Sequence, residues 1–523
     1  MKKFICKYKK SIVAANLFGF LCFGFMLTHF SLTIDEESWI LASKNLTMWL
    51  YQGRYSIWLL ELLFTHGGDY APFLWDFLGI FFWNFSGVIF SYTLFEKKEL
   101  DGKLLFVMLA YYGSIPLVLA DVLSFTMYSV WIGLAVIAVS VAFLLTIRYV
   151  EDADKKKIFF IYLLLVYAFG TYQAFICVYV TAIVAACAVI FLDVPAGTSG
   201  NLVSSLTDGR KNSQENGRKN LVRTIITGAA ECIVAIFSYW LINFLVGILI
   251  GKEEYLENYI GWKEADPFRQ FVLSLANIPR TSLGIGVPGA VSVCVITVLF
   301  AIFAIRRFFK AKGWKEKLGV FFFTVVLCAA PYSLYIAMAS HNTQGRMLLG
   351  IPLVVSVQVY FLYRECNKQW IKRVLAVIVI WTLFINARDM NQYFYYSSIM
   401  YDKDCGVAAQ IMYDVQKTGA DYHIKPIAFI GMLEADELNI KQVGVLGASF
   451  FSWDDGNNSR IRDFLETRGY VVQQPTAEQF AEALEESETM STWPQEGSVV
   501  ELEDVIVVYL SKPTDTWHMT NGI

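Results

Sequence analysis

The stretch "IFFIYLLLVYAFGTYQAFICVYVTAIVAACAVIFL", residues 158–192, decides how often this chain crosses a membrane. A helix needs about 20 consecutive apolar residues to span a bilayer. The run is therefore too long for one helix and short for two. Its clearest polar interruption is "FGTYQ", where Gly170 is followed by Thr, Tyr and Gln, a composition typical of a turn. We predict two helices, 158–171 and 172–192, joined by a turn at the membrane surface.

The charges of the connecting loops test this division. The segments predicted to lie inside carry 27 Lys and Arg: 1–10, 96–103, 148–157, 193–223, 306–317 and 364–373. The loops predicted to lie outside carry 7: 32–72, 121–126, 251–283 and 340–346. Cytoplasmic loops of membrane proteins are enriched in Lys and Arg. The N-terminus is therefore predicted to be cytoplasmic and, after eleven crossings, the C-terminus to be outside. A single helix over 158–192 would exchange the sides of all later loops and remove the bias.

The composition agrees with a polytopic α-helical membrane protein. Of 523 residues, 56% are hydrophobic and only 17% are charged, whereas soluble domains carry about 25% charged residues. We predict eleven spans, near 11–31, 73–95, 104–120, 127–147, 158–171, 172–192, 224–250, 284–305, 318–339, 347–363 and 374–390. The outer loops 32–72 and 251–283 mix aromatic and polar residues at helical spacing, which is typical of segments that lie in the membrane interface.

The end of the chain differs sharply in charge from the rest. Residues 391–523 hold 21 acidic and 8 basic side chains, a net charge of −13, while residues 1–390 carry +10. "PIAFIGML" and "VIVVYL" have the pattern of buried strands, and helical periodicity lies before and between them. We predict a transmembrane domain over 1–390 and a small extracytoplasmic α/β domain over 391–523. No basic stripe lies outside the membrane flanks, so nucleic acid is not a predicted partner.

Three consecutive carboxylates follow the first span, in "SLTIDEESW", residues 31–39. Carboxylates at the edge of a bilayer are costly unless they pair, reach water or do chemistry. One interpretation is a helix start, in which Thr33 or Asp35 is the cap and the helix dipole favours acids in the first turn. That explains one carboxylate better than three. The alternative is a general base at the membrane surface, supplied by one of these acids, which removes a proton from an incoming hydroxyl.

Other candidate residues lie at the ends of predicted spans on the same side. Arg54, in "YQGRYSIW", and Arg346, in "SHNTQGRMLLGIP", are either interfacial anchors or ligands of a phosphate. Asp121 is either a solvated residue at the end of a span or a contact to the sugar or acceptor, and Tyr172 and Gln173 either only turn the chain or contact the sugar as well.

Metal and disulfide sites are not indicated by the sequence. The nine cysteines lack metal-ligand spacing, and His341 has no second His or Cys nearby. "FSWDDGNNS", residues 451–459, lacks the Glu that a Ca²⁺ loop requires, so we predict a helix-capping turn there. Dependence on a divalent metal stays open.

Several of these motifs occur together in a known family. The acidic "DEESW", "YQGRYSIWLLELL", "TYQAF", the outer "QGR" before a helix, and a tail with "IAFIG" and "ASFFSWDD" resemble the Gtr-type bacterial glucosyltransferases of type II. These belong to the polytopic GT-C-type glycosyltransferases that use polyprenyl-phosphate sugars. The resemblance covers most of the chain, and it rests on the order of the motifs and the topology rather than on one motif.

The resemblance implies transfer of a sugar, glucose in this family, from a polyprenyl-phosphate donor to a surface glycan on the outer face of the bacterial inner membrane. It implies an essential acid in the first outer loop, here Asp35 or Glu36, and outer cations at the lipid phosphate, here Arg54 and Arg346. A third acid, Glu37, leaves the identity of the base open. A small flippase and a donor-lipid synthase are the implied partners.

Two other classes of membrane protein fit the sequence less well than a glucosyltransferase does. A transporter would place charges inside its spans, but Asp76 and Glu231 are the notable ionisable residues there, while acids and aromatics gather in the outer loops. A glycan polymerase or ligase that uses a polyprenyl-linked donor is the closer alternative. A large outer loop late in the chain would favour that class, but the late addition in this chain is a terminal domain.

Overall fold

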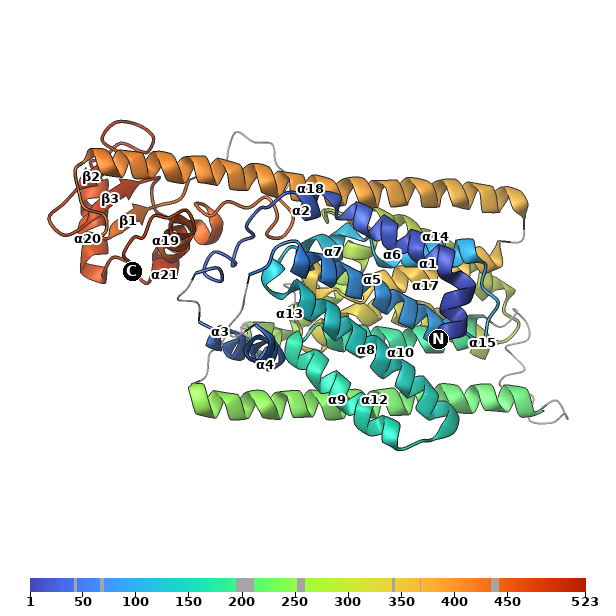
Figure 1. The fold of residues 1–523 in the computed structure, drawn as a ribbon. Coiled ribbons are helices and arrows are strands. Elements are labelled where there is room, and N and C mark those ends of the chain that lie inside the picture. The colour runs from blue at the N-terminus through green and yellow to red at the C-terminus, as the bar shows by residue number, and fades with distance from the viewer. Residues whose placement is uncertain are drawn as a thin grey trace. The chain divides into compact units, whose positions relative to one another are not determined.

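The structure is a computed structural model in which two compact units are described separately (Figure 1). It describes residues 1–41, 45–65, 70–193, 211–251, 259–340, 344–366, 368–433 and 442–523, without the side chains of 211–220. Unit 1 comprises Met1–Leu27, Leu46–Gly67 and Ala71–Asn391. Unit 2 comprises Thr28–Asn45, Gly68–Tyr70 and Gln392–Ile523, so the acidic stretch groups with the end of the chain.

Unit 1 is a bundle of helices. They are α1 (Lys2–Cys22), α2 (Gly24–Thr28, whose last residue belongs to unit 2), α3 (Thr47–Tyr51), α4 (Tyr55–Phe64), α5 (Leu74–Phe95), α6 (Gly102–Tyr112), α7 (Pro116–Val122), α8 (Thr126–Asp152), α9 (Lys156–Thr171), α10 (Phe175–Leu192), α12 (Lys211–Ile250), η2 (Gly261–Lys263), α13 (Pro267–Ser282), α14 (Val291–Lys310), α15 (Trp314–Ala329), η3 (Ala330–Tyr332), α16 (Ser333–Ala337), η4 (Gly345–Met347), α17 (Ile351–Glu365) and the first part of α18 (Gln369–Lys417).

A helix lies at the place of every predicted span, but their lengths differ. Seven helices are long and apolar enough to cross a membrane, and the bent pair α6 and α7, with 53° between its helices, makes up to eight. Helices α9 and α17 have 16 and 15 residues, fewer than the ~20 of a full crossing. The described chain is therefore a polytopic membrane protein by composition, and eleven crossings stay a prediction.

The break in the stretch 158–192 lies where the sequence predicts it. Helix α9 ends at Thr171 and α10 begins at Phe175. Between them Tyr172 has an extended backbone, with φ −158° and ψ 125°, which no helix can continue. The polar turn therefore separates two helices rather than bending one.

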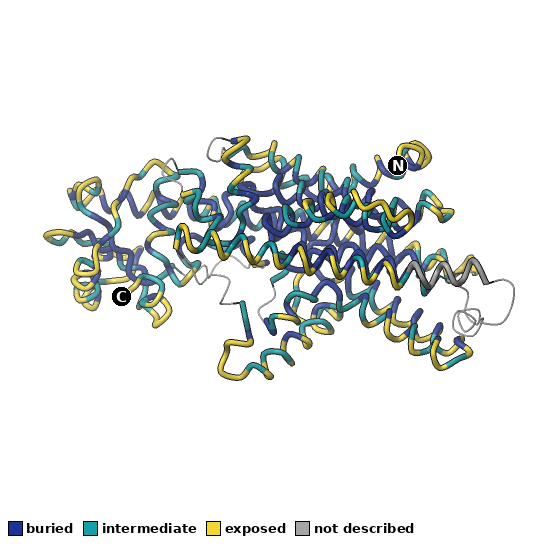
Figure 2. The backbone as a smooth tube through the Cα atoms, turned by 90° about the horizontal axis from the view of Figure 1, so that it is seen from below, coloured by how far each residue is buried: buried dark blue, intermediate teal, exposed yellow. Residues whose placement is uncertain are grey.

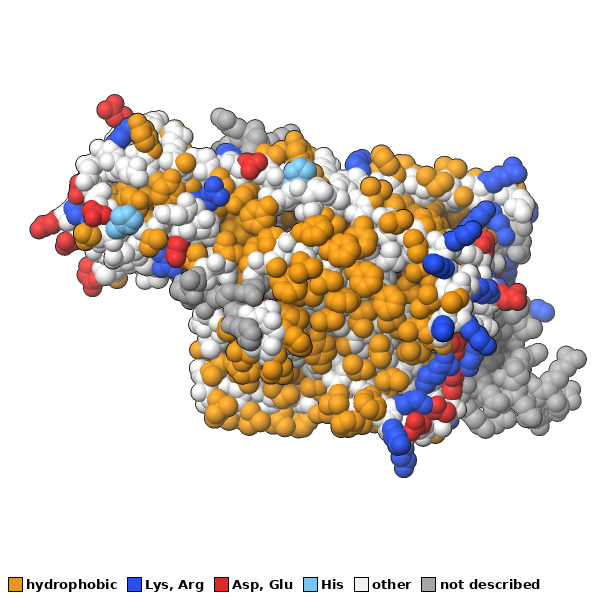
Figure 3. Space-filling view, in the orientation of Figure 1, with side chains coloured by type: hydrophobic (Ala, Val, Ile, Leu, Met, Phe, Trp, Pro, Cys, Tyr) orange, Lys and Arg blue, Asp and Glu red, His pale blue; other side chains and the backbone are white. Residues whose placement is uncertain are grey.

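Unit 1 carries its apolar side chains outward as well as inward. Only 6% of the apolar window in Leu221–Ile250 is buried, so most residues of this part of α12 are exposed or only partly buried (Figure 2). On the face shown in Figure 3, apolar side chains cover the middle of this unit, and Lys and Arg gather at the end where α1 and α18 begin. An apolar belt with a basic rim is the surface expected of a helix bundle in a bilayer.

The two loops predicted to lie in the interface contain short helices in unit 1. The first forms α3 and α4, and the second forms η2 and α13. In α4 the apolar residues dominate, and Leu63 and Phe64 are exposed, as in a helix that lies at a lipid surface.

Unit 2 contains the small sheet. Its elements are the end of α18, β1 (Ile427–Ile430), η5 (Trp453–Asp455), α19 (Asn458–Thr467), α20 (Ala477–Ser487), β2 (Val499–Glu501), β3 (Ile506–Tyr509) and α21 (Asp515–Asn521). The strand order is β1-β3-β2, with β1 parallel and β2 antiparallel to β3. Strands β1 and β3 are the two that the sequence predicts, whereas β2 was not predicted.

The core of unit 2 packs helix α20 and Trp517 against the sheet. Its buried members are Ala428, Ile430, Phe480, Ala483, Val505, Val507 and Trp517. Strands β1 and β3 are almost entirely buried because helices cover them, which explains their continuous apolar sequences.

Candidate functional site

Arg54 lies among three aromatic rings in unit 1. The turn before it contains Gly53 at φ 70°, and Arg54 then precedes the first turn of α4. Its Cζ lies 5.5 Å from the ring centre of Trp49, 5.4 Å from that of Tyr128 and 5.2 Å from that of Tyr172. Three different parts of the chain, α3, α8 and the α9–α10 turn, therefore enclose this guanidinium.

The charge of Arg54 has no acidic partner among the described residues. Its Nε is buried and makes no hydrogen bond there. Aromatic faces attract a cation but accept few of its hydrogen bonds, so the five N–H groups of the guanidinium are left largely unused. A bound phosphate would satisfy both the charge and the donors.

Asp121 and Arg346 form an ion pair in the same unit. The Asp121 carboxylate, which is 3% exposed, accepts from the Arg346 backbone N–H at 3.2 Å and from Nη1 at 3.5 Å. The contact requires η4 to lie directly on α7, and a Cβ on Gly345 would overlap the carbonyl oxygen of Leu117. Glycine at 345 therefore allows this approach.

Tyr128 and Phe125 connect the two arginines. Phe125 stacks on Tyr128 with ring centres 5.0 Å apart, and Arg346 lies 5.4 Å from the Phe125 ring. The Tyr128 ring in turn lies 5.4 Å from Cζ of Arg54, so the two stacked rings lie between the two guanidinium groups. We call this group the arginine cluster; its members are Trp49, Arg54, Asp121, Phe125, Tyr128, Tyr172 and Arg346.

The predicted sugar contacts have partners within the protein. The Tyr172 ring belongs to the enclosure of Arg54. The Gln173 Nε2 donates to the Gln52 carbonyl at 2.9 Å and to the Tyr239 hydroxyl at 2.7 Å. Gln173 thus ties the α9–α10 turn to the turn before Arg54 and to α12, while Asp121 is engaged with Arg346.

Asp35 lies in unit 2, where Arg460 binds it. Its backbone is left-handed, with φ 81°, a conformation that Asp and Asn tolerate better than most residues. Its Oδ1 accepts from Arg460 Nη2 at 3.0 Å, and its side chain is 47% exposed. Of the three consecutive acids, Asp35 is the one that solvent reaches.

Glu36 is buried and bound inside the loop. Its Oε2 accepts from the Thr33 backbone N–H at 3.3 Å and from the Tyr70 hydroxyl at 3.1 Å. Its carbonyl accepts from the N–H of Trp39 at 3.0 Å. Because the residue is 0% exposed, its carboxylate holds the loop together and does not face solvent.

Glu37 is the third acid and is also buried. Burial raises its pKa to about 7, although the Arg460 guanidinium opposes that rise. It hydrogen-bonds Arg460 Nη1 through Oε1, while Oε2 is buried without a partner among the described residues. The carboxylate thus meets one cation without satisfying all of its lone pairs.

Arg460 was not predicted as a site residue, yet it binds two of the three acids. It also donates to Asp454 Oδ2 at 2.9 Å. Asn457 caps α19 through the Arg460 backbone N–H at 3.1 Å, which confirms the predicted capping turn and fixes the position of Arg460. The sequence showed the capping pattern before α19, but it gave no signal that Arg460 would bind Asp35 and Glu37.

Glu61 is a second residue that sequence reasoning missed. It is 2% exposed on α4 of unit 1 and accepts from the Trp131 indole N–H at 2.5 Å and from the Thr65 hydroxyl at 2.5 Å. A lone Glu in an apolar segment gives no signal of such partners.

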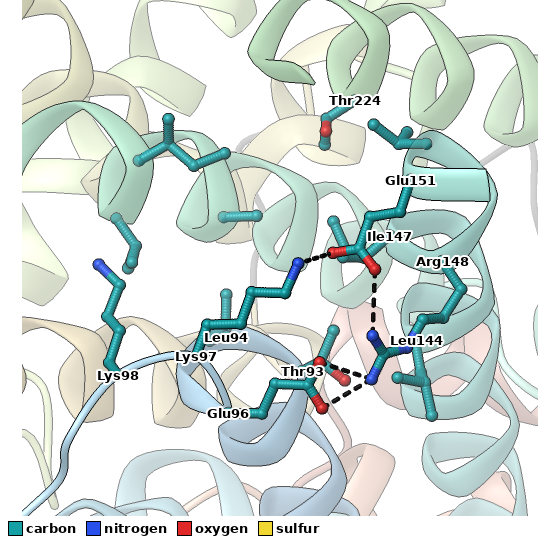
Figure 4. A pocket seen from close by; sticks show the side chains of 14 residues that line it. Thr93, Leu94, Glu96, Lys97, Lys98, Leu144, Ile147, Arg148, Glu151 and Thr224 are labelled. Carbon is teal, nitrogen blue, oxygen red and sulfur yellow. Dashed lines mark hydrogen bonds and ion pairs between the residues drawn. The ribbon is translucent and has the colours of Figure 1, made fainter. Parts of the chain in front are cut away.

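A cavity between α5, α8, α10 and α12 illustrates how other basic residues of unit 1 are neutralised (Figure 4). There Lys97 pairs with Glu151 at 2.5 Å, and Arg148 pairs with Glu96 at 2.6 Å and with Glu151 at 3.0 Å. These cations are already matched by acids, in contrast to Arg54. In the part of the chain that the structure describes, no group of three His, Cys, Asp or Glu could hold a metal ion. His341 lies outside the described residues.

The sequence-predicted residues thus divide between the two units. Arg54, Asp121, Tyr172 and Arg346 come together in the arginine cluster of unit 1, and Gln173 borders it. Asp35 and Glu36 lie with Glu37 and Arg460 in unit 2.

Comparison with known proteins gives one match. A family model described as "Glucosyl transferase GtrII" matches residues 24–387, which include both the acidic stretch and Arg346. No curated protein and no solved structure matches the chain significantly.

Proposed function

Because the chain belongs to the glucosyl transferase GtrII family, we propose that it transfers glucose from a polyprenyl-phosphate donor to a cell-surface glycan at the outer face of the membrane. The helices that are long and apolar enough to span a bilayer suit a donor that is itself a lipid. The glucose is then exchanged between a lipid phosphate and a hydroxyl of the acceptor.

The observation that carries the proposal is the guanidinium of Arg54, which lies in an aromatic enclosure and pairs with no acid in the part of the chain that the structure describes. The leaving group of this reaction is a phosphate, whose negative charge grows as the bond to the sugar breaks. A preorganised cation in a partly enclosed site stabilises such a charge more strongly than one in bulk solvent. Arg346 adds a second positive charge, reduced by its pairing with Asp121.

Asp35 is proposed as the general base. It removes the proton of the acceptor hydroxyl while that oxygen forms its bond to the anomeric carbon. The bond between that carbon and the phosphate oxygen breaks, and polyprenyl phosphate leaves on the opposite face, so a single displacement inverts the anomeric centre. A base must reach its substrate's proton, and Asp35 is the exposed acid of the three.

Glu36 is proposed to act through Asp35. Since its carboxylate is buried and bound by Thr33 and Tyr70, it positions the loop rather than contacting the acceptor. Tyr172 and Gln173 border the arginine cluster and are proposed to line the sugar subsite, with Asp121 supporting Arg346.

The setting follows from the donor. The lipid-linked sugar would be made by a donor-lipid synthase and brought outward by a small flippase, and the enzyme would lie in the bacterial inner membrane with residues 391–523 outside. These partners are proposed because the resemblance to Gtr-type glucosyltransferases implies them.

A deletion strain tests the proposed reaction through mass spectrometry of its surface glycans. Loss of one hexose substituent from an otherwise unchanged glycan, restored by the wild-type gene, is the expected result. A shortened or absent glycan would instead identify a polymerase or ligase, and an unchanged glycan would contradict transfer to the cell surface.

A further inference from the structure

A groove in unit 1 lies between α1, α6, α17 and α18, away from the arginine cluster. Its volume is about 510 Å³, within the range of about 300–1,000 Å³ that is typical of ligand sites. Its walls are mainly apolar, and they are formed by Ala14, Leu104, Phe106, Val107, Val359, Leu375, Ala376, Val379 and Ile380.

Three lysines from three different helices line the same groove. They are Lys10 of α1, Lys103 of α6 and Lys372 of α18. Lys10 and Lys103 are exposed, and the Lys372 Nζ lies 5.1 Å from the ring centre of Tyr363. The groove therefore has an apolar wall and a concentrated positive charge.

None of these lysines forms an ion pair with a described carboxylate. The acid beside them, Asp101, caps α6 through the Lys103 backbone N–H at 3.1 Å and accepts from the Tyr363 hydroxyl at 2.9 Å. Some basic side chains of the bundle are paired, as Lys97 is with Glu151 and Lys310 with Glu365, both at 2.5 Å. What distinguishes Lys10, Lys103 and Lys372 is that they meet around one apolar groove, a combination that suits an anion with an apolar chain.

The groove lies at the ends of α6 and α17 that are far from Asp121 and Arg346. Helix α17 begins after Arg346 and reaches the groove with Val359 and Tyr363. Helix α6 begins at the groove. Helix α7, which follows α6 after the bend, carries Asp121 near its end. A helix of 15 residues, as α17 is, spans about 22 Å at 1.5 Å per residue. A lipid headgroup in this groove is therefore held far from the proposed donor phosphate.

From this geometry we infer that the groove binds an anionic glycerophospholipid of the leaflet opposite to the donor site. The phosphodiester lies among Lys10, Lys103 and Lys372, and an acyl chain follows the apolar wall along Val107, Ala376 and Ile380. Basic pockets between membrane helices commonly select anionic headgroups in this way. Glycerophospholipids are the bulk phosphate lipids of that leaflet, and the inference does not rest on the proposed glucosyl transfer.

Native mass spectrometry of the full-length protein in detergent tests this inference, with phosphatidylglycerol as the probe. The variant Lys10→Gln/Lys103→Gln/Lys372→Gln should bind it at least about tenfold more weakly than the wild type, because each lysine near a headgroup contributes to binding. The groove-filling variant Ala376→Phe should also weaken binding while leaving all three charges in place.

Matched controls separate the groove from general surface charge. Lys155→Gln/Lys156→Gln/Lys315→Gln removes three exposed lysines outside the groove and should bind phosphatidylglycerol like the wild type. Zwitterionic phosphatidylcholine should bind weakly to every variant. Equal losses in the two triple variants would reduce the effect to diffuse charge and overturn the inference. Displacement of phosphatidylglycerol by stoichiometric short-chain polyprenyl phosphate, or by inorganic phosphate, would also overturn it.

Discussion

Arg54 keeps a positive charge between aromatic faces, without a carboxylate in the described part of the chain. Its Nε is buried and makes no hydrogen bond to a described residue, which costs free energy that the cation–π contacts offset only in part. Such an arrangement is understandable when a ligand supplies the missing anion. The sequence indicates Arg54 as a candidate, but Trp49, Tyr128 and Tyr172 reach it from distant positions, so the enclosure could not be predicted from local patterns.

Replacing Arg54 tests the phosphate assignment. Arg54→Gln should raise the donor KM about 10- to 100-fold, because a charge-assisted hydrogen bond is worth about 1.5–3 kcal/mol. Arg54→Lys should recover part of the loss as a point charge without the planar fork. Steady-state kinetics with varied donor provide the measurement, and Arg269→Gln, an exposed arginine of α13, is the control. Unchanged donor KM in Arg54→Gln would remove Arg54 from the donor site.

Asp35 can be tested against a closely matched acid. Asp35 and Asp454 both have left-handed backbones, both bind Arg460 Nη2, and their side chains are 47% and 42% exposed. Asp35→Asn should lower kcat by about 10²–10⁴-fold, the usual contribution of a general base. Asp454→Asn should leave kcat within a factor of about two, because Asp454 is assigned no proton transfer. A surface change of this kind also shifts the stability of the protein only slightly.

Both variants retain a residue that accepts the left-handed backbone, so each should fold as the wild type does. Thermal unfolding of the purified proteins checks this. Equal losses of kcat in Asp35→Asn and Asp454→Asn would mean that the acids only hold Arg460, and Asp35 would then not be the base.

At the scale of elements, the contact between η4 and α7 positions Arg346. Gly345→Ala places a methyl group against the Leu117 backbone carbonyl, so η4 must shift and the pairing of Arg346 with Asp121 weakens. We expect a lower melting temperature and a raised donor KM, since overpacking typically costs about 1–3 kcal/mol. Gly406→Ala is the control. Gly406 is a residue of α18, and a Cβ added there would meet no atom within 4 Å. A Gly345→Ala protein with wild-type stability and KM would show that this approach is not required.

Element types were largely predictable because they depend on local pattern. The polar Thr171, Tyr172 and Gln173 marked the end of α9, and continuous apolar runs marked β1 and β3. The bend between α6 and α7 was missed, because an apolar sequence with one Pro at position 116 is compatible with one long helix. The strand β2 has only three residues, of which Glu501 is exposed, so its pairing with β3 left no periodic signal.

At the scale of the whole molecule, the acidic stretch groups with the end of the chain. Arg460 binds Asp35 and Glu37, although more than 400 residues separate them along the chain. Periodicity and charge counts describe neighbours in sequence, so they gave the acids and the acidic tail but not the contact between them. The family match ends at residue 387, before Arg460.

The topology is testable by cysteine labelling. In a variant without its nine cysteines, Ser491→Cys should react with a membrane-impermeant maleimide in spheroplasts, whereas Lys155→Cys should react only after permeabilisation. The reason is the excess of basic residues in the segments predicted to be cytoplasmic. The reverse pattern would invert the proposed orientation and place the acceptor inside the cell.

The central claim is that glucose comes from a lipid phosphate. Its most direct test supplies the purified full-length protein with labelled glucose on either a short-chain polyprenyl phosphate or a nucleoside diphosphate, together with surface glycan from the deletion strain. The account predicts that label enters the glycan from the polyprenyl-phosphate donor alone, and that Arg54→Gln impairs this transfer. Incorporation from the nucleotide sugar alone would contradict it.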